Sequence, residues 1–400
     1  MMEYRILNKA DLPLEVVILL IAGTILLISG VLLLPVSAGA LPFYENGLHG
    51  LFLVMFALQM ITLGKTPFGD VPRSKLLLTA GVPIAAVGIV TCFIPGIFGP
   101  IPRILLFLCF GPGGLVLLLQ TCFAKNRLRT WAKYGGIFRH LIFGCSAVYA
   151  LSMLMALLLW KQSLLTTLMT AVAAQLYGVA IFYLAGVLRK IYRAYPEAEK
   201  GPEGDVALST DQAMLLLMAV FMLLLGVLLI PVNLGLLPFS GSAQLGLLMV
   251  IFAVQMLASG STPISPFPRS WLVIAFGLLF AALGIVSCII PEVLVASLTV
   301  LVGVLNILGG VITVVKICIP RLKKSEGARR HVPAILTKLF AAQLTLNLLA
   351  VMFGTSMLIP NLIHGLVIGV ILAANGATLL YLLHILIVLD GVQSDMARAM

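Results

Sequence analysis

One stretch of sequence occurs twice in this chain. Residues 30–95 align with residues 226–291 without a gap, at a constant offset of 196 (226 minus 30), and about half of the paired positions are identical. The string GVLLLPV at 30–36 returns as GVLLIPV at 226–232, and LPF at 41–43 returns at 237–239. Self-similarity at one fixed offset predicts that the two halves share one architecture.

The amino-acid composition indicates that this architecture lies in a membrane. The chain is 61% hydrophobic and 10% charged, with a mean hydropathy of +1.16. A soluble domain needs a polar-rich surface, and apolar runs of 18 or more residues are long enough to cross a bilayer as helices. We therefore predict an all-α, polytopic membrane protein with twelve spans: 15–35, 46–64, 76–95, 100–123, 137–160, 164–188, 212–231, 243–260, 271–290, 294–318, 334–358 and 362–389.

The spans divide into two parallel repeats. We expect six helices in residues 1–188, a charged cytoplasmic linker at 189–211, and six helices in residues 212–400. Lys and Arg gather in alternate loops, whereas the opposite loops hold little beyond Arg103 and Lys161. The positive-inside bias then predicts a protein of the inner (plasma) membrane with both termini in the cytoplasm. Because each half has an even number of spans, the axis relating the copies should follow the membrane normal.

The positions of the charged residues and of the cysteines disfavour two other classes, nucleic-acid-binding proteins and metal- or cofactor-binding proteins. The net charge of +11 arises from loop residues that act as orientation signals, so nucleic acid is not an expected partner and membrane lipids are. The six cysteines show no CxxC pair or other metal spacing, so we expect no metal and no cofactor.

Prolines and glycines suggest that the spans form hairpins. A proline is expected to end the first helix of a hairpin at Pro35, Pro95, Pro231, Pro291 and Pro360, and glycine pairs such as Gly113-Gly114 and Gly309-Gly310 mark the second helix. Small residues allow helix backbones to approach closely in lipid, which we favour over a substrate path.

A resemblance to a known family rests on four parts of the sequence: the segment from Gly88 to Pro95, its copy from Gly284 to Pro291, and the helices around Gly113 and Gly309. This pattern resembles the short-repeat membrane proteins of the HdeD type, the bacterial acid-resistance family with six spans in three hairpins. The chain would be two such units in tandem. The fifth span departs from the pattern, because Leu159-Trp160-Lys161 replaces the proline at its tip. The resemblance implies architecture and no catalytic residues.

Charged groups avoid the middle of every predicted span. All Asp and Glu residues fall at span ends or in loops, and His384 is the one ionisable residue expected well inside a span. Buried charges mark proton relays and ion sites, so a proton-coupled or metal-ion carrier is disfavoured. No HExxH, GxSxG or phosphate-binding glycine loop is present in the sequence, so we expect a non-enzymatic protein.

Three repeated polar features remain as candidates. Gln59 and Gln255 occupy equivalent places in the second and eighth spans. An amide can bind an uncharged polar ligand, and it can equally join neighbouring helices through a hydrogen bond; we favour the second role.

The loops after these spans repeat the pairs Thr66/Arg73 and Thr262/Arg269. Thr-Pro and Pro-Arg-Ser are typical helix punctuation, with Ser74 and Ser270 as caps. The alternative is a cytoplasmic gate or partner site.

Glu15 and Asp211 are the third pair, each in the first turn of a helix, where the helix dipole favours a carboxylate. A pairing of these acids with Arg73 or Arg269 is a hypothesis.

Two functions remain open. The first is a non-enzymatic integral membrane protein that acts through helix packing and through partners or a homo-oligomer, as an HdeD-like stress protein or a subunit of an assembly. The alternative is a transporter, channel or facilitator for a neutral or apolar solute, whose twelve-span layout is similar to that of major facilitator carriers. We favour the first, and a solid, glycine-packed interface on the repeat axis would support it, whereas a polar-lined cavity would favour transport.

Overall fold

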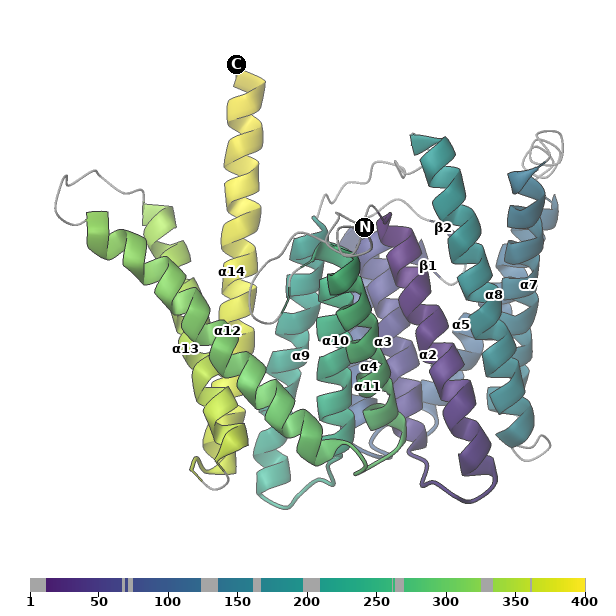
Figure 1. Ribbon diagram of the computed structural model, residues 1–400, viewed down its shortest axis with the longest axis horizontal. Coiled ribbons are helices and arrows are strands. Elements are labelled where there is room, and N and C mark those ends of the chain that lie inside the picture. Colours follow the sequence, from purple (N-terminus) through teal and green to yellow (C-terminus); the bar gives the residue numbers. More distant parts are fainter. Residues whose placement is uncertain are drawn as a thin grey trace, which may run out of the picture. The chain divides into compact units, whose positions relative to one another are not determined.

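In its described residues the chain is all-helical apart from one pair of two-residue strands in a loop, as the computed structural model shows (Figure 1). The structure describes residues 12–66, 69–70, 75–123, 136–160, 167–196, 209–260, 262, 270–324, 334–359 and 362–399. The strands, β1 (Lys65–Thr66) and β2 (Gly69–Asp70), pair antiparallel.

Twelve helices lie within the described residues. Those of the first half are α2 (Leu14–Ser37), α3 (Glu45–Leu63), α4 (Lys75–Phe93), α5 (Ile101–Phe123), α7 (Ile137–Trp160) and α8 (Thr167–Ala194). Those of the second half are α9 (Thr210–Asn233), α10 (Gly241–Ser259), α11 (Trp271–Ile289), α12 (Val295–Lys324), α13 (Ala334–Leu358) and α14 (Gly365–Ala399). Each coincides with one predicted span, which confirms the predicted fold class.

The helices have the length and composition of membrane spans. Among the described residues, eleven helices are long and apolar enough to cross a bilayer. The twelfth, α4, has a shorter apolar stretch, Leu77–Phe93, within 19 helical residues. At 1.5 Å per residue, 19 residues extend about 28 Å, close to the roughly 30 Å of a bilayer's hydrocarbon core.

Helix packing divides the chain into two compact units. Unit 1 contains α2, α3, α4, α5, α7, α8, α10 and α11, and unit 2 contains α9, α12, α13 and α14. In unit 1, α10 and α11 from the second half pack against helices of the first half. Packing therefore divides the chain differently from the predicted boundary at 189–211, which concerns the sequence repeat and stays a prediction.

Helices at equivalent positions in the two sequence halves pack against equivalent neighbours. In unit 1, α2 packs on α8, α3 on α4, and α10 on α11. In unit 2, α9 packs on α14, which matches the pairing of α2 with α8. The bounds of α3 and α10, and of α4 and α11, differ by 196 at both ends (241 minus 45, 259 minus 63, 271 minus 75, 289 minus 93).

The most enclosed helices are α3 and α10, with 78% and 89% of their apolar windows buried, against 17% for α13. Helices that are apolar on every side are expected either at the centre of a bundle or against lipid. The low buried share of α13 leaves its apolar side chains free to meet lipid.

Two details of the helix ends differ from expectation. Pro35 and Pro231 lie inside the last turns of α2 and α9, which end two residues later, so the prediction that these prolines end the helices is wrong in position. The missing proline N–H releases only one carbonyl, four residues earlier, and the last turn tolerates the change. In addition, α8 continues to Ala194, six residues into the predicted linker, because Arg and Lys are good helix formers beyond an apolar span.

Candidate functional site

The predicted glutamines both lie within helices of unit 1. Gln59 is half-buried in α3, which packs on α4, α5 and α11. Gln255 is half-buried in α10, which packs on α11, α4 and α2. Their assignment to a ligand or to an interhelical hydrogen bond stays a prediction.

The predicted gate loops are only partly described. Thr66 ends strand β1 and Thr262 follows α10, whereas Arg73 and Arg269 lie outside the described residues. The helices before both loops end at a glycine rather than at the Thr-Pro pair: Gly64 and Gly260 adopt φ of 70° and 77°. Glycine takes this left-handed conformation without steric strain, and each donates its N–H to a carbonyl of the last helical turn.

The helix-start acids contact neighbouring helices differently in the two halves. Glu15 accepts a hydrogen bond from the phenol of Tyr192, which joins α2 to α8. Asp211 is exposed, and the adjacent Gln212 instead donates from Nε2 to Oδ2 of Asp390 at 2.7 Å, which joins α9 to α14. Their pairing with Arg73 or Arg269 cannot be followed, because both arginines are outside the described residues.

Serine caps begin α9 and α11, and the second of these caps, Ser270, was predicted. Ser209 and Gln212 form a capping box at the start of α9, with both reciprocal hydrogen bonds present. The hydroxyl of Ser270 accepts a hydrogen bond from the Val273 N–H at the start of α11. Ser74, the other predicted cap, is outside the described residues.

Two reciprocal backbone hydrogen bonds join the halves at the centre of unit 1. The N–H of Tyr44 donates to the carbonyl of Ile289, and the N–H of Ser240 donates to the carbonyl of Phe93, both at 2.9 Å. The donors differ by 196 (240 minus 44), and so do the acceptors (289 minus 93). The hairpins α3–α4 and α10–α11 therefore contact each other in the same way from both sides.

Glycines bring the helices of this centre into backbone contact. A Cβ placed on Gly50 of α3 would lie 2.4 Å from the carbonyl oxygen of Gly88 in α4. The equivalent distance from Gly246 in α10 to the Gly284 oxygen in α11 is 2.5 Å. No larger residue fits at such distances, so α3–α4 and α10–α11 both depend on glycine for their approach.

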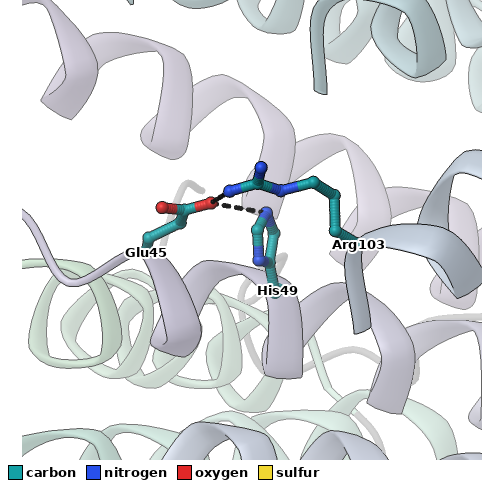
Figure 2. Close-up of polar contacts among 3 residues, drawn as sticks. All are labelled: Glu45, His49 and Arg103. Carbon is teal, nitrogen blue, oxygen red and sulfur yellow. Dashed lines mark hydrogen bonds and ion pairs between the residues drawn. The ribbon is translucent and has the colours of Figure 1, made fainter. Parts of the chain in front are cut away.

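A charged cluster lies beside this centre, at the starts of α3 and α5 (Figure 2). Oε1 of Glu45 accepts a hydrogen bond from Nη2 of Arg103 at 2.7 Å. Nε2 of His49, one turn along α3, lies 3.6 Å from the same oxygen. The carboxylate thus lies between an imidazole and a guanidinium group, as Figure 2 shows.

Burial is unequal within the cluster. The side chain of His49 is 5% exposed, whereas those of Glu45 and Arg103 are 35% and 38% exposed. Among the described residues, Nε2 of His49 has no hydrogen-bond partner. A buried polar atom left unpaired costs about 1–3 kcal/mol, and a half-exposed ion pair returns about 0–1 kcal/mol. The cluster is therefore a poor source of stability.

The second half forms the same hairpin without these charges. The positions equivalent to Glu45, His49 and Arg103 at the offset of 196 are Gly241, Leu245 and Thr299. Because α10 has the same length as α3 and the same glycine contact with its partner, the cluster is not needed to build the fold.

The cluster of Glu45, His49 and Arg103 was not predicted, although the sequence contains a signal for it. Glu45 and His49 are four residues apart at a helix start, a spacing that brings side chains together, and Arg103 starts a later span. His384 lies inside the candidate span Gly365–Gly391, as expected, but its side chain is exposed, whereas His49, one turn from the start of α3, is buried. His49 lies close to the start of its span in the sequence, and its burial depends on the packing of α3 against neighbouring helices.

The helices and their polar contacts define a multi-pass, helical integral membrane protein. Comparison of the chain with protein-family models, with curated proteins and with solved structures found no match.

Proposed function

We propose that the protein is a non-enzymatic component of the plasma membrane that acts through helix packing and protein partners, in the manner expected of an HdeD-like stress protein or of a membrane subunit in an assembly. Both termini are placed in the cytoplasm by the basic loops. One observation carries the proposal: where the two sequence halves meet, their helices touch through their backbones at Gly47 and Cys288.

The support comes from three close approaches in unit 1. Gly50 lies against Gly88, and Gly246 lies against Gly284. Between the halves, a Cβ on Gly47 would lie 1.9 Å from the carbonyl oxygen of Cys288, so α3 and α11 touch through their backbones. A solute path along this contact would require the helices to separate.

The side chains around the contact are apolar and fully buried. Leu51, Leu53, Ile89 and Ile285 are each 0% exposed in α3, α4 and α11. In lipid, such close packing and interhelical hydrogen bonds, rather than the hydrophobic effect, hold helices together. A rigid membrane scaffold that presents its outer helices to partners or to further copies fits this construction.

The alternative is a facilitator for a neutral or apolar small solute. The observation in its favour is the cluster of Glu45, His49 and Arg103, which is present in one half only and adds little stability. An unevenly charged entrance would orient a polar solute, and the half-buried Gln59, farther along α3, and Gln255 in α10 would offer amide groups.

Aqueous access to the glutamine positions distinguishes the two functions. We would place single cysteines at positions 59 and 255 in a cysteine-free background and treat sealed membranes with a charged, impermeant thiol reagent from each side. A cysteine in the charged segment 197–208 serves as the reactive control.

The packing proposal predicts that neither position is labelled while the control reacts fully. Labelling of both positions would mean that water reaches the centre, and the facilitator would then replace the scaffold as the preferred function.

A further inference from the structure

Two cysteines occupy the centre of the contact between the halves. Cys92 is in the last turn of α4, Cys288 is in the last turn of α11, and their numbers differ by 196. Both side chains are 0% exposed. They are therefore equivalent residues that the fold brings to the same place.

Gly47 contacts both cysteine residues, the thiol of Cys92 and the backbone of Cys288. Sγ of Cys92 lies 3.7 Å from the carbonyl oxygen of Gly47, and Gly47 itself is against the backbone of Cys288. Cys92 and Cys288 are both free thiols in the structure, and the backbone of Gly47 lies against both residues. Sγ of Cys288 donates to the carbonyl of Ala243 at 3.6 Å, which repeats the contact of Cys92 with Gly47 (243 minus 47 is 196).

Tyr44 closes this site from the side. Its hydroxyl donates to the carbonyl of Cys92 at 3.1 Å, and its N–H donates to Ile289, next to Cys288. Burial raises the pKa of the Tyr44 phenol, so the group stays protonated and keeps this hydrogen bond. The site is held by four helices of unit 1, α3, α4, α10 and α11, and does not rest on one flexible side chain.

We propose that Cys92 and Cys288 form a disulfide that covalently joins the two halves of the chain. The packing role proposed above is not needed for this inference. The basic loops place the ends of α4 and α11 at the external face, where proteins meet oxidising conditions and disulfides persist.

The reaction is an exchange with an external disulfide, R–S–S–R. The Cys92 thiolate attacks one sulfur of that disulfide and releases one R–S⁻; the Cys288 thiolate then attacks the Cys92 sulfur of the mixed disulfide and releases the second R–S⁻. The external disulfide takes up two electrons, and the two R–S⁻ groups that it releases take up, through water, the two protons that the cysteines lose, which gives two thiols. Because both sulfurs are buried in the folded chain, the exchange takes place before the two hairpins close on each other.

The test uses the full chain with a protease site introduced within residues 197–208, in a background where Cys109, Cys122, Cys145 and Cys318 are replaced by alanine. Cells are lysed in N-ethylmaleimide so that no thiols exchange afterwards. The protein is then cleaved and run on denaturing gels with and without reductant. We expect the two fragments to migrate as one species without reductant and as two with it.

Cys92→Ala and Cys288→Ala, each in the same background, should give two fragments under both conditions. As a positive control, Phe93→Cys with Ser240→Cys in a cysteine-free chain places thiols at a pair of residues whose backbones are hydrogen-bonded across the halves.

Separate fragments from the Cys92/Cys288 chain without reductant, with the control pair still joined, would overturn the proposal. Joining only after copper phenanthroline is added would also overturn it, because the thiols would then be adjacent but not oxidised in the cell.

Discussion

Replacing Gly50 by alanine tests the central glycine contact most directly. The new Cβ would lie 2.4 Å from the Gly88 carbonyl oxygen and 2.8 Å from Cβ of Cys92. An ordinary contact begins near 3.4 Å, so α3 and α4 must separate by about 1 Å (3.4 minus 2.4) at the oxygen. Neither neighbour is the end of a flexible side chain, so the helices themselves must move.

The expected loss follows from two opposing effects. Overpacking of a well-packed interior costs about 1–3 kcal/mol. Alanine also gains up to about 1 kcal/mol over glycine in helix propensity. Gly186→Ala in α8 isolates the second effect, because its Cβ would meet nothing within 4 Å. The two variants should therefore differ by about 1–3 kcal/mol in the free energy of unfolding, the range of the overpacking effect alone.

The assay is thermal unfolding of the purified protein in lipid nanodiscs, followed by tryptophan fluorescence. We expect the order of Tm to be Gly186→Ala at or above the parent, and Gly50→Ala clearly below it. Gly246→Ala should behave like Gly50→Ala, because its Cβ would lie 2.5 Å from the Gly284 oxygen. A Tm for Gly50→Ala equal to that of Gly186→Ala would refute the claim that backbone contact fills the centre.

Three further outcomes are expected from the polar contacts. His49→Leu should raise the Tm, because it removes a buried nitrogen whose lack of a hydrogen bond costs about 1–3 kcal/mol. Leu245→His, the reverse change at the equivalent buried position, should lower the Tm. The opposite order of Tm values in thermal unfolding would contradict the energetic account of the cluster. Ser209→Ala should destabilise α9 by about 1 kcal/mol through loss of its capping box, seen as faster amide hydrogen exchange in the first turn of that helix and nowhere else. Tyr192→Phe should loosen α2 from α8, since the hydrogen bond to Glu15 is lost; unchanged proteolysis and exchange at the end of α8 would show that this bond contributes nothing.

The sequence by itself determined the helices. Twelve apolar runs, separated by charged or Pro/Gly-containing loops, became twelve helices, because a backbone in hydrocarbon must satisfy its own hydrogen bonds and the helix does so within one segment. Helix ends could also be predicted where the cause is local, as at the Ser270 cap. They were misread at Pro35, where a proline in the last turn is tolerated, and at Ala194, where charged residues continue the helix.

The partners of those helices were decided only by the tertiary structure. Apolar periodicity carries little information when every face of a helix is apolar, because lipid and protein neighbours then suit it equally well. The sequence therefore indicated Gln59 and Gln255 through their repetition, but it did not show that Gly47 contacts both Cys92 and Cys288 or that Arg103 and His49 contact the same carboxylate of Glu45. These contacts join residues dozens to hundreds of positions apart, and they arise from the close backbone approach at Gly47 and Gly50, whose distances depend on two helices at once.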